Sequence, residues 1–173
     1  MASLTVSQVS ARFATMWANF SNDDNGLRIE NAFPAIPRIL NAALLPAVIP
    51  FPGNGVYTRD RYGEAIIGET RSYRCVLYVS SATMGNIQTG QTDVEGYFTP
   101  VRNYFAARPG MEDDTESAPK TVVAKLDILN DEGYIMAEYP IGINDTGQFT
   151  LGLFHAIAFN FEVHTFDTVT YKD

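Results

Sequence analysis

Apolar and polar residues alternate over a long run near the end of the chain, from residue 151 to residue 169. The opposite face of this run changes from small apolar residues to polar and charged ones. This alternation predicts a strand buried on its first face, far longer than the usual length of about five or six residues. Such a strand needs a matching sheet or a partner chain for its backbone hydrogen bonds, so we expect the chain to assemble. The first face carries Leu151, Leu153, His155, Ile157, Phe159, Phe161 and Val163.

Two other segments carry apolar residues at helical spacing. In residues 6–20 they form one stripe, and Ser3 or Thr5 is in position to cap the start. This pattern predicts an amphipathic helix of about four turns whose stripe faces the core. The second helical pattern covers residues 94–105.

The second helix has a signal at its start and an interruption inside it. Thr92, followed three residues later by Glu95, resembles a capping box. Pro100 lacks the amide hydrogen that an interior helical residue donates. We therefore expect the helix either to kink at Pro100 or to restart there, with Thr99 as its cap and Pro100 at its first position.

Strand patterns account for much of the remaining chain. Residues 69–80 predict a firm strand, which is central in a sheet because part of its second face is also apolar. The prolines between Pro34 and Pro52 discourage a continuous helix or a central strand. Residues 27–32 are therefore expected to form a short strand, and residues 44–51 an edge strand or extended segment.

Turn residues divide the last third of the chain. The cluster at residues 130–133 lies between two β-rich runs, residues 122–129 and 134–139, and predicts a hairpin. A second turn cluster, at residues 144–148, precedes the long final strand. The complete order predicts a single α+β domain over residues 1–173, with a mainly antiparallel sheet and two helices packed on one face.

Composition narrows the classes of function. The chain has 20 acidic and 12 basic residues and a formal net charge of −8, which argues against wrapping nucleic acid by neutralising its phosphates. Cys75 is the only cysteine, so no disulfide within the chain is expected. No apolar run reaches about 18 residues and no signal-peptide pattern opens the sequence. We therefore expect a soluble protein that is made in the cytoplasm and has no membrane partner.

Candidate catalytic and metal-binding residues are few. His155 and His164 are an odd number of positions apart on the final strand, so they lie on opposite faces and cannot share a metal. Glu162 and His164 share a face and could form an ion pair. Cys75 lies within an apolar strand as a small buried residue, and the turn at residues 53–55 lacks the Lys and Ser or Thr of a phosphate-binding loop. The sequence predicts no enzyme, no metal and no cofactor.

The order of these elements resembles a known family. Its matching features are the opening helix at residues 6–20, the proline-rich run Leu44–Pro50, the charged arm that leads into residues 69–79, the helix at residues 94–105 and the final strand that turns polar. Together they are similar to the tail terminator and tail-completion proteins of long-tailed bacteriophages. The resemblance spans nearly the whole chain and rests on element order and texture, not on an invariant motif.

The resemblance implies a structural virion protein. Its copies would form a hexameric ring between the tail tube and the head connector, and DNA would pass through the ring without specific binding. The implied partners are other copies of the chain, the tail tube protein and the head-connector protein, in the virion tail or neck.

Two charged segments receive expected roles in such a ring. Residues 57–68 are predicted to form a projecting arm that docks on a neighbouring subunit or on the tube; the candidate interface residues are Arg59, Arg61, Glu64, Glu162 and His164. Residues 109–119 are predicted to form a mobile acidic loop. Its carboxylates are expected to face the DNA channel or an adjoining ring, and they belong to Glu112, Asp113, Asp114 and Glu116.

Two alternatives stay open at this point. The chain could be another virion component, either a neck or connector subunit or a tail tube subunit. A more distant alternative is a small-molecule-binding or hydrolytic α+β domain that uses Glu162, His164 and the turn at residues 53–55.

Overall fold

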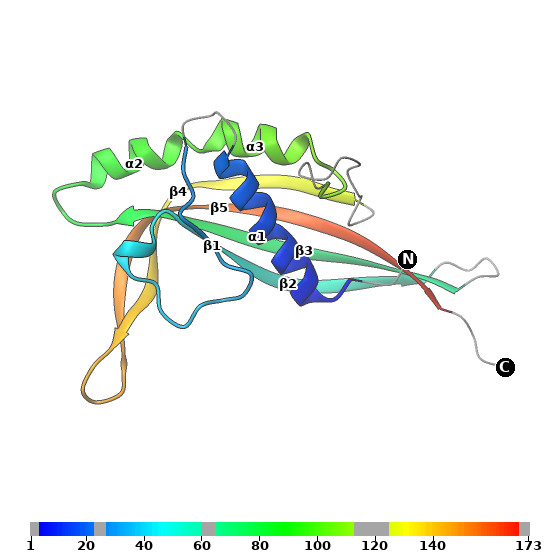
Figure 1. Ribbon diagram of the computed structural model, residues 1–173, viewed down its shortest axis with the longest axis horizontal. Coiled ribbons are helices and arrows are strands. Elements are labelled where there is room, and N and C mark those ends of the chain that lie inside the picture. The colour runs from blue at the N-terminus through cyan, green and yellow to red at the C-terminus, as the bar shows by residue number, and fades with distance from the viewer. Residues whose placement is uncertain (1–3, 23–26, 60–64, 113–124, 170–173) are drawn as a thin grey trace.

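A long, curled sheet forms the frame of the molecule, and the helices pack against it (Figure 1). The computed structural model describes residues 4–22, 27–59, 65–112 and 125–169. The fold is α+β, as the sequence predicts. The sheet has five strands in the order β1-β2-β3-β5-β4, with β1 parallel to β2 and all other neighbours antiparallel. The expected antiparallel sheet with two helices on one face therefore agrees only roughly, since the sheet is mixed and the described chain has more helices.

Two long hairpins supply four of the five strands. β2 and β3 form one hairpin, β4 and β5 form the other, and β3 pairs with β5 between them. The strands are β1 (Asn31–Ala32), β2 (Ala47–Arg59), β3 (Ala65–Ser81), β4 (Lys125–Ile143) and β5 (Phe149–Val169). The helices are α1 (Val6–Asn22), the short 3₁₀ helix η1 (Ala42–Leu44), α2 (Ile87–Glu95) and α3 (Phe98–Ala106).

The long final strand is confirmed. β5 has 21 residues and pairs with β3 on one side and with β4 on the other. The sequence predicted one buried face, but the middle of β5 is buried on both. Ile157 and Phe159 belong to one hydrophobic cluster, and Ala156 and Ala158 belong to a second cluster across the sheet.

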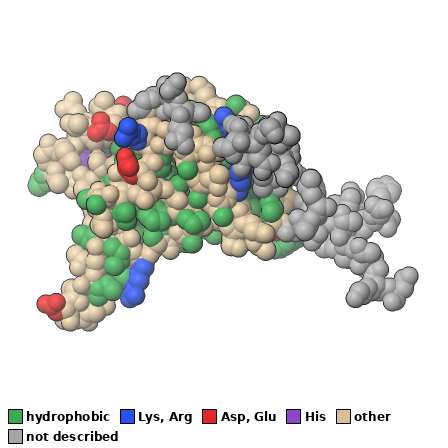
Figure 2. Space-filling view, viewed as in Figure 1, with side chains coloured by type: hydrophobic (Ala, Val, Ile, Leu, Met, Phe, Trp, Pro, Cys, Tyr) green, Lys and Arg blue, Asp and Glu red, His purple; other side chains and the backbone are tan. Residues whose placement is uncertain are grey.

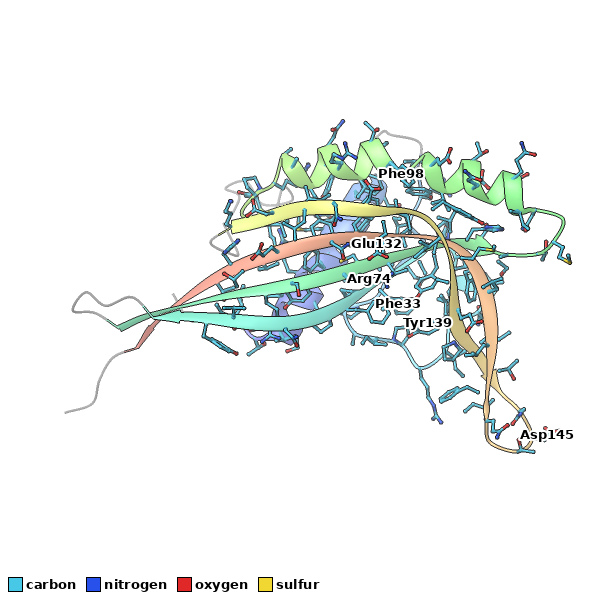
Figure 3. The ribbon with its side chains drawn as sticks, turned by 180° about the vertical axis from the view of Figure 1, so that it is seen from behind. Phe33, Arg74, Phe98, Glu132, Tyr139 and Asp145 are labelled. Carbon is cyan, nitrogen blue, oxygen red and sulfur yellow. The ribbon has the colours of Figure 1, made fainter. Side chains whose placement is uncertain are left out.

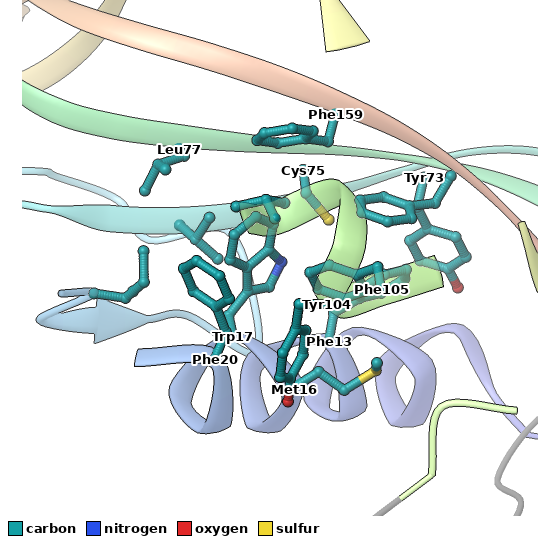
Figure 4. Close-up of a cluster of buried hydrophobic side chains, with 14 of the residues drawn as sticks. Phe13, Met16, Trp17, Phe20, Tyr73, Cys75, Leu77, Tyr104, Phe105 and Phe159 are labelled. Atoms are coloured by element: carbon teal, nitrogen blue, oxygen red, sulfur yellow. The ribbon is translucent and has the colours of Figure 1, made fainter. Parts of the chain in front are cut away.

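The first cluster lies between the sheet and the three α-helices (Figure 4). Aromatic rings of α1 and α3 meet in its centre, where the ring centroids of Trp17 and Phe105 are 4.9 Å apart. Phe105 in turn lies 4.8 Å from Phe161 of β5. Cys75 of β3 is fully buried here, and burial raises the pKa of its thiol to about 12. This confirms the interpretation of Cys75 as a small buried residue.

The second cluster lies on the opposite face of the sheet. Leu40 and other apolar residues of the segment between β1 and β2 cover Val76 and Ala156 there. Of the predicted short strand at residues 27–32, only β1 forms. The predicted extended segment at residues 44–51 splits, because η1 ends at Leu44 and β2 begins at Ala47.

The predicted start of the second helix is wrong. α2 begins at Ile87, so Thr92 lies inside the helix, where its hydroxyl donates to the backbone carbonyl of Gln88 instead of capping. The chain restarts as α3 at Phe98, so Pro100 falls in a first turn, where its missing amide hydrogen has no intrahelical acceptor to lose. The expected restart occurs, but two residues earlier than a cap at Thr99 requires.

The predicted hairpin around residues 130–133 is also wrong. β4 is one strand of 19 residues through this point, and its pairing with β5 shifts between Ile128 and Asn130 and again between Asp131 and Tyr134. Each shift inserts one extra residue, which is a β-bulge. Gly133 has a φ of 69° there. Turn-forming residues therefore mark a bulge, because β5 is long enough to pair along nearly all of β4.

Candidate assembly surfaces

One face of the sheet carries a group of polar side chains on β3, β5 and β4. Tyr73 and Cys75 of β3 point into the helix-side core, so the residues that alternate with them lie on the opposite face. Figure 3 shows this face with α1 behind the sheet. The polar face, as we call it, consists of Thr70, Ser72, Arg74, Lys125, Asp127, Asn130, Glu132, Asn160, Glu162 and His164.

His164 lies between a hydroxyl and a carboxylate on the polar face. Its Nδ1 is 3.0 Å from Thr70 Oγ1, and its Nε2 is 3.3 Å from Asp127 Oδ2. The ammonium of Lys125 lies 2.7 Å from the same carboxylate oxygen. Hydrogen bonding from Lys125, with a smaller effect from His164, lowers the pKa of Asp127. The charged partner of His164 is therefore Asp127 on β4, and not the Glu162 that sequence alternation suggested.

The order Thr70, His164, Asp127 is that of a nucleophile, a base and an orienting acid. Thr70 is registered with Val56 of β2 on one side and with His164 on the other. Its backbone groups are therefore used in the sheet and are not offered as oxyanion-hole donors. The three side chains can hold one another in place, but they lack the electrostatic half of a hydrolytic site.

A bidentate ion pair joins β3 to the bulge of β4 (Figure 3). Arg74 Nε and Nη2 each lie 2.7 Å from a carboxylate oxygen of Glu132. Asn160 of β5 donates to Glu132 and to Asn130. Hydrogen bonding from Arg74 lowers the pKa of Glu132. Sequence reasoning missed this pair, because Glu132 was placed in a hairpin turn.

His155 is buried in a separate network on the helix side. Its Nε2 is 3.0 Å from Asn86 Oδ1 and its Nδ1 is 2.8 Å from the Tyr134 hydroxyl. An amide oxygen only accepts, so Nε2 carries the proton and Tyr134 donates to Nδ1. His155 and His164 therefore lie on opposite faces, as predicted, and His155 joins α2 to β4 and β5.

The acidic loop begins from a fixed point. Arg12 of α1 donates through Nε and Nη2 to the carbonyl of Met111, at 2.8 and 2.6 Å, and Met111 is fully buried. The Glu112 carboxylate accepts from the backbone N–H of Gly110 at 3.0 Å. Glu112 is thus held locally. The other expected loop carboxylates, Asp113, Asp114 and Glu116, lie outside the described residues.

The predicted charged arm coincides with the end of the β2–β3 hairpin. β2 ends at Arg59, and Arg61 and Glu64 lie outside the described residues. At the base of this end, Arg71 Nε donates to Glu69 at 2.7 Å, and its Nη1 donates to the carbonyl of Gly53 at 2.8 Å. This end of the sheet extends past the helices in Figure 1.

The β4–β5 hairpin bends away from the sheet at the opposite end and exposes large apolar side chains (Figure 2). Leu151 and Leu153, predicted to be buried, are 55% and 40% exposed, because β3 pairs with β5 only from Phe154 onward. The turn at residues 144–148 joins the two strands, as predicted. Met136, Ile141, Ile143 and Phe149 are the other exposed apolar residues of this hairpin. Apolar residues on both sides of a turn were the available signal.

Little else in the described part of the chain offers a reactive centre. A hollow of about 380 Å³ lies between α3 and β4, but its charged residues Arg102 and Asp131 pair with each other at 3.2 Å. Among the residues that the structure describes, no three His, Cys, Asp or Glu side chains are grouped to hold a metal ion. None of the described helices is both long and apolar enough to span a bilayer.

Comparison with known proteins gives no relative to draw on. No protein-family model matches the chain, and no curated protein matches it significantly.

Proposed function

We propose that this chain is a structural, non-enzymatic subunit that assembles with copies of itself into a closed ring. We further propose that the ring is a tail terminator, which caps the tail tube of a long-tailed bacteriophage and joins it to the head connector. The observation that carries self-assembly is the exposed apolar surface of the projecting β4–β5 hairpin. A contiguous apolar surface on one protruding element is typical of a protein contact site.

The phage setting is supported by the order of elements. An opening helix, a proline-rich entry into a long hairpin, later helices and a very long final strand are the features in which the chain resembles tail terminators. Hairpins that leave the sheet at both ends give each subunit two different contact surfaces. A closed ring needs such a pair, because each subunit contacts its two neighbours through different patches.

Charge fits the passage of DNA through the ring. A net charge of −8 disfavours a grip on phosphates. Asp113, Asp114 and Glu116 are proposed to face the channel or an adjoining ring. Glu112 is less suited to this role, because its carboxylate is bound to Gly110.

Electron microscopy of the purified protein, alone and mixed with tail tubes, tests the function. A tail terminator gives rings that sit on the ends of tubes. Polymerisation of the chain into tubes of its own would instead favour the tail tube alternative, and rings that bind only connectors would favour a neck subunit. A strictly monomeric protein at high concentration, with no rings beside tail tubes, contradicts the proposal.

A hydrolytic function is the second candidate, because Thr70, His164 and Asp127 are aligned. Activated esters of increasing acyl size test it on the wild-type protein and on a Thr70→Val variant. We expect neither protein to exceed the buffer rate, because the site lacks oxyanion-hole donors. Hydrolysis by the wild-type protein that disappears in Thr70→Val would replace the structural proposal.

A further inference from the structure

Exposed apolar side chains gather at two opposite ends of the sheet. The first group, the end face, consists of Met84, Ile87, Met136, Ile143, Phe149, Leu151 and Leu153. Ala82 N–H donates to the carbonyl of Leu153 at 2.8 Å, so the connection between β3 and α2 lies beside the hairpin (Figure 1). The second group, the β2 edge, consists of Val56 and Tyr57, which are 63% and 64% exposed.

The end face is large enough for a stable contact. Side chains of this size, about half exposed, present on the order of 600 Å² of apolar surface, which is the upper limit for a typical monomer and close to the roughly 800 Å² that each partner buries in a standard interface. Met84 alone is 98% exposed. The area is too small for an obligate two-fold dimer core, and it matches one contact of a ring.

Both groups also lie on unpaired strand edges. β1 pairs with β2 only at Ala47 and Val48, and Pro50 and Pro52 block the next part of that edge. From Gly53 onward β2 has no proline. On the end face, β5 has β4 on one side, while its pairing with β3 starts at Phe154. Unpaired edges at both surfaces allow main-chain hydrogen bonds to add to apolar contact.

Charges beside the two surfaces are balanced although the chain as a whole is acidic. Arg38 lies 5.7 Å from the ring of Phe149, and Glu138 is registered opposite Leu153. At the other end, Glu69 is registered opposite Tyr57, and Arg71 pairs with Glu69. One residue of each sign borders each surface, so contact there avoids the repulsion expected between two acidic proteins.

We propose that the end face of one copy binds the β2 edge of the next copy, so that the ring contact runs head to tail. This inference rests on the proposed self-assembly and names the two surfaces that make it. A two-fold contact of end face on end face would leave Val56 and Tyr57 uncovered. The head-to-tail contact covers both surfaces and leaves each copy free to bind a further one.

A complementation experiment tests the head-to-tail contact. The end-face variant carries Leu151→Glu and Leu153→Glu, and the β2-edge variant carries Val56→Glu and Tyr57→Glu. Leu129→Glu is the matched control, because Leu129 is 56% exposed, like Leu151, but lies in neither surface. Light scattering after gel filtration gives the mass of each protein, and circular dichroism and melting temperature check that each is folded.

Head-to-tail contact predicts that each double variant is monomeric and that an equimolar mixture forms dimers only. In the mixture, the intact β2 edge of one variant meets the intact end face of the other. Self-association of each variant alone should weaken by about tenfold or more, since buried unpaired charges are strongly unfavourable. The Leu129→Glu control should assemble like the wild type. A β2-edge variant that assembles normally, or a mixture of folded variants that stays monomeric, overturns the inference.

Cysteine pairs provide a second readout if a glutamate variant does not fold. Oxidation should link Val56→Cys in one copy to Leu151→Cys in the next and give a ladder of multimers, whereas Leu129→Cys paired with Leu151→Cys should not. Absence of the ladder from assembled protein contradicts the named contact. If the wild-type protein is monomeric at every concentration, the proposed function fails; if it assembles while both double variants also assemble, only this inference fails.

Discussion

At the scale of single residues, the contact between Gly90 of α2 and His155 of β5 fixes the helix on the sheet. A Cβ at position 90 would lie 2.3 Å from His155 Cδ2. The imidazole cannot move away freely, because Tyr134 and Asn86 hold both of its nitrogens.

We predict that Gly90→Ala destabilises the protein by about 1–3 kcal/mol, which is typical of overpacking, although alanine is normally the better helix former. The midpoint of urea unfolding measures the change. Gly85→Ala is the control, because a Cβ at position 85 meets nothing within 4 Å, and it should leave the midpoint nearly unchanged. Equal effects of the two substitutions would contradict the His155 contact.

The bidentate pair of Arg74 and Glu132 predicts a pH-dependent contribution to stability. The pKa of Glu132 is lowered from its ordinary value of 4.5, so the contribution is complete above about pH 4.5 and is lost as the pH falls through the folded-state pKa.

Glu132→Gln should reduce the free energy of unfolding by about 0.2–1 kcal/mol at pH 7, because the pair is partly exposed. The difference from wild type should shrink below about pH 4.5. Unfolding curves at a series of pH values provide the measurement, and Glu138→Gln on the same strand is the control. A difference that grows as the pH falls would show that the sign of the linkage is wrong.

At the scale of elements, the bulge in β4 determines how far the strand pairs with β5. Gly133 adopts a φ of 69°, which costs other residues about 1–2 kcal/mol. Gly133→Ala should therefore lower stability by about 1 kcal/mol, measured by denaturant unfolding. Gly142 also lies in β4 but has no positive φ and no close neighbour, so Gly142→Ala should have little effect. If both variants behave alike, the strand does not depend on the bulge.

Local pattern predicted the elements whose signals are long and regular. α1, β3, β5 and the turn at residues 144–148 all form where the sequence places them, within a few residues. The cap at Thr92 and the hairpin at residues 130–133 were wrong, because short polar signals have more than one structural outcome. A turn-like cluster ends a strand when no partner continues beyond it, and it becomes a bulge when β5 continues beside it.

The candidate surfaces were less accessible from sequence than the fold. Alternation placed Glu162 and His164 on one face, but the partner of His164 depends on the register of β4 against β5, which local sequence does not encode. The exposure of Leu151 and Leu153 likewise depends on where β3 stops. Both features arise from contacts between strands far apart in the chain.

At the scale of the whole molecule, the sheet joins two contact regions at its ends. The middle of β3 and β5 is buried on both faces and forms a rigid centre, while the hairpins extend from that centre in opposite directions (Figure 1). Rigid spacing between two different contact patches favours closure at one subunit number over open chains. The account therefore predicts a defined ring and not a mixture of lengths.

Native mass spectrometry of the wild-type protein over a range of concentrations tests this claim most directly. The account predicts monomer and one closed oligomer, whose subunit number stays the same as concentration rises; the resemblance to tail terminators implies six. A protein that remains monomeric at the highest concentration, or a continuous ladder of oligomers without a preferred size, would contradict it.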